Sequence, residues 1–173
     1  LLIKSNGSLW GHGRNYNYQL GGGSNGNRYN HVEMVSSGVV KADGGMQYSL
    51  YLKDDGSVRS VGVLGLGNPI ISEGGATISA GNGHILIVKS DGSLWGGGAN
   101  GSGQLGDGTT IQRNTLIQIM PKEVADASAG GAHSLILKKN GQLWGAGQNQ
   151  WGQLGDGTTI QRHSPVYITG NTW

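Results

Sequence analysis

The hydrophobic pattern of this chain is a short apolar run, an Asn-Gly or Asp-Gly pair, and a second short run. In the clearest copy, HSLILK at 133–138 has apolar residues on both sides of an expected strand, which is typical of a strand covered on both faces. Asn140-Gly141 and then QLWGAG at 142–147 follow. Because such pairs favour tight hairpin turns with positive φ at both central residues, the pattern predicts a β-hairpin.

The same hairpin signal occurs four times, at Asn6-Gly7, Asp55-Gly56, Asp91-Gly92 and Asn140-Gly141. A further strand is expected before the hairpin, as at 76–81 and 124–130. A polar loop of about sixteen residues and a last strand, such as PVYI at 165–168, are expected after it. Each unit is therefore predicted to be a four-stranded antiparallel sheet, and no segment has the period of an amphipathic helix.

The units are copies of one another. GQLGDGTTIQR occurs at 103–113 and, unchanged, 49 residues later at 152–162. A period of this length marks a repeat architecture, and small sheets repeated every ~40–50 residues are typical of the blades of a β-propeller. A β-solenoid is the rival fold, but the hairpins argue against parallel coils. We expect an all-β propeller with an incomplete first blade at 1–35, a short divergent blade at 36–75, and blades at 76–123 and 124–173, the last range including the start of the next strand.

The second copy is the divergent one. Gly56 lies only 36 residues before Gly92, so the long loop is missing, and Arg59 stands where the other copies have tryptophan. It is either a degenerate blade or one whose lost loop, near 63–68, leaves a recess for a partner. In the regular copies, the tryptophan of Trp-Gly-X-Gly is expected to fill the space between blades, and its glycines to let strands bend or approach closely.

Composition excludes several classes of function. The chain has no cysteine, so it has neither disulfides nor thiolate chemistry. Its net charge of +2 gives no electrostatic footprint for nucleic acid. No apolar run is long enough to span a membrane. Glycine is abundant, at 35 of 173 residues, but recurs at fixed places in the repeat, which indicates an ordered, turn-rich fold.

The run AGGAHSLILKKNGQLWGAGQNQWGQLGDGTTIQRHSPVYI, at 129–168, closely resembles the repeats of the regulator of chromosome condensation family. It has that family's Gly-Gly-X-His-Ser, Asn-Gly turn, Trp-Gly-X-Gly-X-Asn, Gly-Gln-Leu-Gly and late Pro-Val. The resemblance covers essentially the whole chain and is closest in the third and fourth copies.

The resemblance implies a seven-bladed propeller that mostly binds other proteins, so this chain is expected to form about half of a ring. Its polar repeats look like those of bacterial members, which suggests the outside of a bacterial cell. The resemblance implies a non-enzymatic protein-binding scaffold, with nucleotide exchange on a small GTPase and a structural or surface-display role as alternatives. Leu1 aligns with Leu135 and Trp173 with Val124, so the chain is expected to self-associate or to pack with further propeller sequence.

Catalytic, cofactor and metal sites are not predicted. Gly96-X-Gly98-X-X-Gly101 matches a dinucleotide fingerprint only on paper, because no helix follows it. His84 and His133 are each alone in their blades, and we expect buried histidines whose partners are backbone carbonyls. Asp107 and Asp156 give one carboxylate per loop, which favours a turn-stabilising role over calcium binding.

Two sets of residues are candidates for binding a protein partner. Exposed loop aromatics are preferred at interfaces, and Arg residues that end the long loops could attract an acidic partner. The alternatives are that the aromatics cover strand ends of their own blade, and that the recurring Lys and Arg residues are solvated strand ends. The candidate contact residues are Tyr16, Tyr18, Tyr29, Trp151, Arg113 and Arg162.

Overall fold

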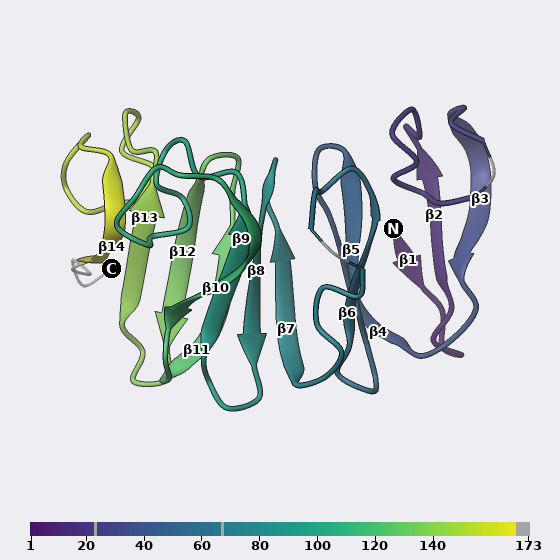
Figure 1. Ribbon diagram of the computed structural model, residues 1–173, viewed down its shortest axis with the longest axis horizontal. Coiled ribbons are helices and arrows are strands. Elements are labelled where there is room, and N and C mark those ends of the chain that lie inside the picture. Colours follow the sequence, from purple (N-terminus) through teal and green to yellow (C-terminus); the bar gives the residue numbers. More distant parts are fainter. Residues whose placement is uncertain (23, 67, 169–173) are drawn as a thin grey trace.

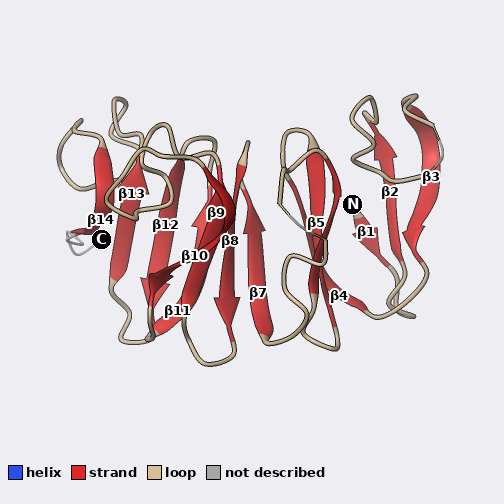
Figure 2. Ribbon diagram, viewed as in Figure 1, coloured by secondary structure: helices blue, strands red, loops and turns tan. Residues whose placement is uncertain are grey.

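The computed structural model describes residues 1–22, 24–66 and 68–168. These residues form strands and loops and no helix, so none of them belongs to a helix that could cross a membrane (Figure 2). The strands form four antiparallel sheets that stand in a row, which we call blades 1 to 4 in chain order (Figure 1). The all-β prediction is confirmed.

Blades 3 and 4 have four strands each, as the sequence predicts. The strands of blade 3 are β7 (Gly75–Ala80), β8 (His84–Lys89), β9 (Leu94–Gly98) and β10 (Arg113–Met120). Those of blade 4 are β11 (Val124–Ala129), β12 (His133–Lys138), β13 (Leu143–Gly147) and β14 (Arg162–Ile168). In both blades each strand pairs with its neighbour in the chain, so β8–β9 and β12–β13 are the predicted hairpins.

Blades 1 and 2 have three strands each among the described residues, so the four-stranded unit is complete only in blades 3 and 4. Blade 1 is formed by β1 (Leu2–Ile3), β2 (Leu9–Gly13) and β3 (Arg28–Val35), and blade 2 by β4 (Val39–Gly44), β5 (Tyr48–Lys53) and β6 (Val58–Gly62). In blade 2 the chain is too short for a loop and a fourth strand, and a bridge from Val58 to Ile71 stands in the place of that strand. The start of a further strand, expected after Ile168, lies outside the described residues.

The recess expected near 63–68 is largely filled in the part that the structure describes. Four half-buried residues of the short connection pack against the core of blades 2 and 3: Leu64, Leu66, Ile70 and Ile71. A Cβ added at Gly97 of blade 3 would come within 3.2 Å of Leu66. Aliphatic side chains thus replace the missing loop.

The core lies between the sheets. Fully buried Leu50 and Val58 of blade 2 pack with Ile78 and Ile87 of blade 3, and similar clusters join blades 1 and 2 and blades 3 and 4. Burying one such side chain stabilises the fold by about 1.5–3 kcal/mol. Aliphatic residues therefore form most of the filling between blades, for which the sequence suggested the tryptophans.

The tryptophans are half-buried instead. The indole of Trp95 donates a hydrogen bond to Ser93 Oγ (2.9 Å), and Lys89 Nζ lies 4.6 Å from its ring centroid. Lys4 covers Trp10 and Lys138 covers Trp144 in the same way. A lysine stands three residues before each hairpin glycine, at Lys4, Lys53, Lys89 and Lys138, and all but Lys53 are placed by one of these cation–π contacts.

The hairpin turns differ in type from the expectation. In the first, Gly7 N–H donates to Lys4 O (2.9 Å) and Lys4 N–H to Ser8 O (3.0 Å). The loop has three residues, not two, and in it only the glycine has positive φ (76°). Asn6 Oδ1 accepts a hydrogen bond from Ser8 N–H (3.1 Å), which stabilises this turn. These turns lie along one edge of the row, the hairpin edge, and the long loops lie along the opposite edge, the loop edge (Figure 1).

Candidate functional site

The long loops after β2, β9 and β13 are rigid frames on the loop edge (Figure 1). Each is built around a fully buried asparagine, Asn15, Asn100 or Asn149. The Oδ1 atom accepts the N–H of the leucine five residues on, at 2.8–2.9 Å. The Nδ2 group donates across the loop, to Ser24 O in blade 1 and to Asp107 Oδ1 in blade 3, both at 2.9 Å.

In blades 3 and 4 an ion pair closes the loop. Arg113 Nε donates to Asp107 Oδ2 at 2.7 Å, and Arg162 Nε to Asp156 Oδ2 at 2.8 Å. Burial alone would raise the pKa of Asp156, but hydrogen bonds from Thr158, Arg162 and Asn149 together lower it to about 2. The expected turn-stabilising aspartates therefore also hold two of the candidate contact residues, Arg113 and Arg162, inside their own loops.

The loop of blade 1 has no such ion pair. Gly22 stands at the position of Asp107, and Arg28 stands at that of Arg113. Arg28 Nη2 donates to Ser24 Oγ at 2.9 Å, as Arg113 Nη2 does to Thr109 Oγ1 at 3.2 Å. Arg28 Nε is buried and has no hydrogen-bond partner among the described residues. The guanidinium is thus held as in blade 3 but without a carboxylate.

The frames are also tied to the next blade. Ser49 Oγ of blade 2 donates to Gln19 O at 2.6 Å, and Ser134 Oγ of blade 4 donates to Gln104 O at 2.7 Å. Blade 3 follows blade 2, which lacks the long loop. In blade 3 the residue at the position of Ser49 and Ser134 is Ile85, which is fully buried. A serine at that position would have no glutamine carbonyl to bond.

His84 is part of this contact between blades. Its Nε2 lies 3.0 Å from Ser134 Oγ, and because that hydroxyl donates to Gln104 O, Nε2 must be the donor. Its partner is therefore a serine of the next blade, not the backbone carbonyl that the sequence suggested. Burial, aided by His133, lowers the pKa of His84 to about 4, so the ring is neutral near pH 7. Tyr48, at the same place in blade 2, donates to Gly81 O (3.0 Å) and His84 O (2.8 Å).

The predicted aromatic residues lie on the surface. The exposed fraction is 90% for Tyr29, 82% for Trp151, 59% for Tyr16 and 47% for Tyr18. Tyr29 belongs to β3, and the other two tyrosines to the loop of blade 1. Trp151 belongs to the loop of blade 4, at the opposite end of the row (Figure 1). The three tyrosines are therefore one group, and Trp151 is separate from it.

Tyr18 has an unusual backbone conformation. Its φ is 58°, in the left-handed region, whereas the other loops have Gly103 and Gly152 at this position, both with φ of 71°. A Cβ at Gly103 would lie 2.7 Å from His163 Cα in β14 of the next blade. Blade 2 has no corresponding strand among its described residues, so a side chain fits at position 18. Alignment of the three loops identifies this substitution, but only the structure shows that the left-handed conformation is kept.

The structure places no three His, Asp or Glu side chains of the described ranges close enough together to hold a metal ion.

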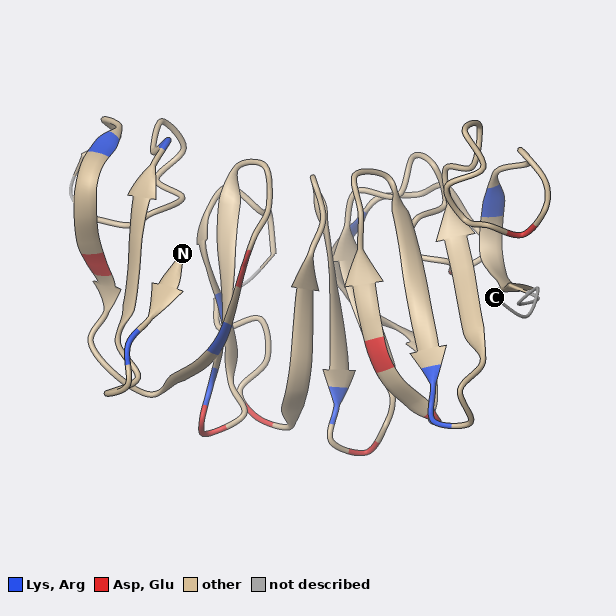
Figure 3. Ribbon diagram, turned by 180° about the vertical axis from the view of Figure 1, so that it is seen from behind, with Lys and Arg blue, Asp and Glu red and all other residues tan. Residues whose placement is uncertain are grey.

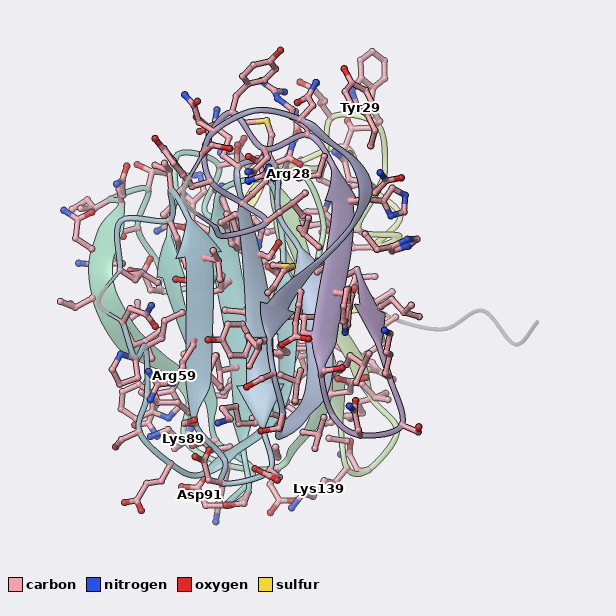
Figure 4. All side chains as sticks on the ribbon, turned by 90° about the vertical axis from the view of Figure 1, so that its right-hand side faces the viewer. Arg28, Tyr29, Arg59, Lys89, Asp91 and Lys139 are labelled. Atoms are coloured by element: carbon pink, nitrogen blue, oxygen red, sulfur yellow. The ribbon has the colours of Figure 1, made fainter. Side chains whose placement is uncertain are left out.

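A hollow of about 250 Å³ lies in blade 1, lined by Asn27, Arg28, Tyr29, Asn30 and Val32. Arg28 and Tyr29 lie at the loop edge, and Lys89, Asp91 and Lys139 at the hairpin edge (Figure 4). The loop edge of blade 1 thus holds Tyr16, Tyr18 and Tyr29 together with Arg28, whose loop offers it no carboxylate.

Comparison with known proteins agrees with this geometry. Models of the regulator of chromosome condensation (RCC1) repeat match residues 91–137 and 140–172, and a second model of the repeat matches 124–153. No curated protein sequence matches. Yeast RCC1 (Prp20), solved bound to Kap60, superimposes with a TM-score of 0.81 and 18% identity, over 98% of this chain and 46% of that one.

Two further solved structures give the same picture. Prp20p from Saccharomyces cerevisiae matches with a TM-score of 0.81 and 18% identity, over 98% of this chain and 48% of that one. Human WBSCR16 matches with a TM-score of 0.76 and 21% identity, over 95% and 48%. The chain spans about half the length of these structures, and it has the fold of about half an RCC1 propeller. Residues 91–172, which form most of blades 3 and 4, therefore consist of regulator of chromosome condensation (RCC1) repeats.

Proposed function

We propose that this chain is a non-enzymatic protein-binding scaffold whose contact surface is the loop edge of blade 1, where it meets the shortened blade 2. The observation that carries the proposal is Tyr18, held at φ of 58° where the other loops have glycine. A left-handed conformation costs a side chain such as tyrosine about 1–2 kcal/mol. Strained residues of this kind concentrate at functional sites.

The neighbouring side chains support this role. Tyr16 and Tyr29 are 59% and 90% exposed on the same blade, so these rings do not stabilise the core. Exposed tyrosines on a rigid frame bind with little loss of conformational entropy, and tyrosine is enriched among residues that dominate binding energy. Asn15 and the bond from Ser49 to Gln19 O provide that frame.

The solved structures of similar fold are consistent with a protein partner. Yeast RCC1 (Prp20) has been solved bound to Kap60, and Prp20p is described by its binding to Gsp1p and histones. At 18% identity this likeness concerns the fold, so the partner of this chain has to be found by experiment.

The test compares Tyr18→Gly with the wild-type chain as bait, and measures the affinity of the partner so captured. Restoring glycine should leave the melting temperature unchanged or raise it, because the left-handed strain is removed. A contact residue should cost ~2 kcal/mol or more of binding, about thirtyfold in Kd. Ile111→Ala, at a 61% exposed apolar residue in the loop of blade 3, is the matched control and should keep the affinity.

A lower melting temperature for Tyr18→Gly with unchanged binding would show that Tyr18 is a packing residue. If the captured partner is a small GTPase, its nucleotide release is measured with and without the chain. Acceleration by the wild-type chain would replace the scaffold role with exchange activity.

A further inference from the structure

The loop edge of blade 1 carries positive charge, whereas the loops of blades 3 and 4 each pair their own arginine with an aspartate. Residues 1–32 contain Lys4, Arg14 and Arg28 but no Asp or Glu. Lys4 lies over Trp10 at the hairpin edge, which leaves the two arginines on the loop side. Figure 3 shows blue and no red on this part of blade 1, whereas the loop of blade 4 has both colours.

The repeat itself shows what is missing beside Arg28. In blades 3 and 4 the equivalent arginine donates Nε to an aspartate of its own loop, at 2.7 and 2.8 Å. In blade 1 the bond to the loop hydroxyl is kept, but glycine replaces the aspartate, and Nε has no partner in the part of the loop that the structure describes. A Cβ built on Gly22 would lie 3.4 Å from Arg28 Nη2, so an aspartate there would place its carboxylate against the guanidinium.

From these contacts we infer that Arg28, with Arg14, binds carboxylate side chains of an acidic polypeptide segment on the partner, beside Tyr16, Tyr18 and Tyr29. Guanidinium groups form strong, charge-assisted hydrogen bonds with carboxylates. The hollow lined by Asn27, Arg28 and Tyr29 provides room next to the arginine. The inference rests on the proposed function and specifies the chemistry of the partner. A small overall charge of +2 favours a local acidic segment over nucleic acid.

The experiment uses a fluorescently labelled peptide of alternating glutamate and serine, the same peptide with glutamine for glutamate, and a single-stranded oligonucleotide. The glutamate peptide should bind, and its affinity should fall steeply as salt is added. The glutamine peptide should bind at least about tenfold more weakly, since a hydrogen bond to a charged group contributes roughly one to two powers of ten in affinity. The oligonucleotide should bind no better than the glutamine peptide.

Three variants identify the residues. Arg28→Gln and Arg14→Gln should each weaken the glutamate peptide several-fold, and Gly22→Asp should do the same by supplying an internal carboxylate. Lys139→Gln, at the hairpin edge, removes one positive charge far from the site and should change the affinity less than twofold (about the scatter between independent sites). Melting temperatures confirm that each variant is folded.

Equal binding of the two peptides, or equal weakening by Arg28→Gln and Lys139→Gln, would overturn the inference. Oligonucleotide binding that depends on Arg28 would assign the surface to nucleic acid and overturn it too. If Tyr18→Gly loses the captured partner but Arg28→Gln and Gly22→Asp keep it, the acidic chemistry is wrong and the proposed function stands. If Tyr18→Gly keeps that partner, the proposed function fails, whatever the peptides do.

Discussion

The stability of the contact between blades 3 and 4 should depend on the protonation of His84. This ring is fully buried, and Nε2–H donates to Ser134 Oγ, while Nδ1 has no partner within residues 1–22, 24–66 and 68–168. Burial and His133 lower its pKa from 6.5 to about 4 in the folded chain. The folded state therefore disfavours the charged ring.

The sign and size of the effect follow from this shift. Above pH 6.5 the ring is neutral in both states and the stability is complete. Between pH 6.5 and pH 4 the unfolded chain takes up a proton that the folded chain does not, so stability falls as the pH is lowered, and below pH 4 this loss levels off. A shift of this size corresponds to about 3 kcal/mol in total.

The chain itself suggests the matched variant, His84→Tyr. Tyr48 occupies the same place in blade 2, and its hydroxyl donates to two carbonyls of the next blade, Gly81 O and His84 O. A tyrosine at 84 would face the corresponding carbonyls of Gly130 and His133 and does not titrate in this pH range. His84→Gln, which also donates without titrating, serves if the larger ring destabilises the fold.

The assay is urea unfolding at a series of pH values from 7.5 to 3.5 (about the range that brackets both pKa values). Wild-type stability should fall relative to the variant through the window from 6.5 to 4. Carboxylates such as Asp156, whose pKa falls from 3.8 to about 2 on folding, lose their stabilisation mainly toward the acid end of this range, and they do so equally in both proteins. Parallel curves for wild type and both variants would show that His84 does not couple folding to pH.

Two further substitutions test the contacts between blades. Gly56→Ala should cost about 2–4 kcal/mol of unfolding free energy, and Gly141→Ala about 1 kcal/mol. Both glycines have positive φ, but only a Cβ at 56 would meet the next blade, 2.8 Å from Gly74 N. Equal losses in urea unfolding would argue against close packing of the hairpin edge. Ile85→Ser should cost about 2–4 kcal/mol by the same measurement, because it removes a buried side chain and adds a hydroxyl with no glutamine carbonyl beside it. A cost below about 1 kcal/mol would mean that another acceptor serves that hydroxyl.

Much of the fold was predictable because its signals are local and recur. Asn140-Gly141 and its three counterparts identify the hairpins, and the period of 49 residues identifies blades 3 and 4 as copies. The turn type was not predictable, since Asn-Gly serves both a two-residue and a three-residue hairpin loop, and only the backbone shows that glycine alone has positive φ.

The candidate site was predicted in part. Exposure of Tyr16, Tyr18, Tyr29 and Trp151 agrees with the expectation for contact residues, but their binding stays a prediction. Sequence could not show that Trp151 lies at the other end of the row, because the order of the blades in space is a tertiary property. The partner of His84 lies 50 residues away in the next blade, where no local pattern points to it.

The irregular features of blades 1, 2 and 3 are related, because those of blades 1 and 3 lie at positions that would contact the segments missing from blade 2. Loss of the fourth strand of blade 2 removes the backbone that, in blade 4, excludes a side chain at the position of Gly103, and Tyr18 occupies that position in blade 1. Blade 2 also lacks the long loop whose carbonyl would correspond to Gln104 O, the acceptor of Ser134 Oγ in blade 4. In blade 3, Ile85 stands at the position of that serine. Ile85 and Leu66 then bury apolar surface where the polar contact stood. Both neighbours of the shortened blade therefore carry side chains that fit beside it: Tyr18 keeps the left-handed conformation without meeting a strand, and Ile85 is fully buried without needing a glutamine carbonyl.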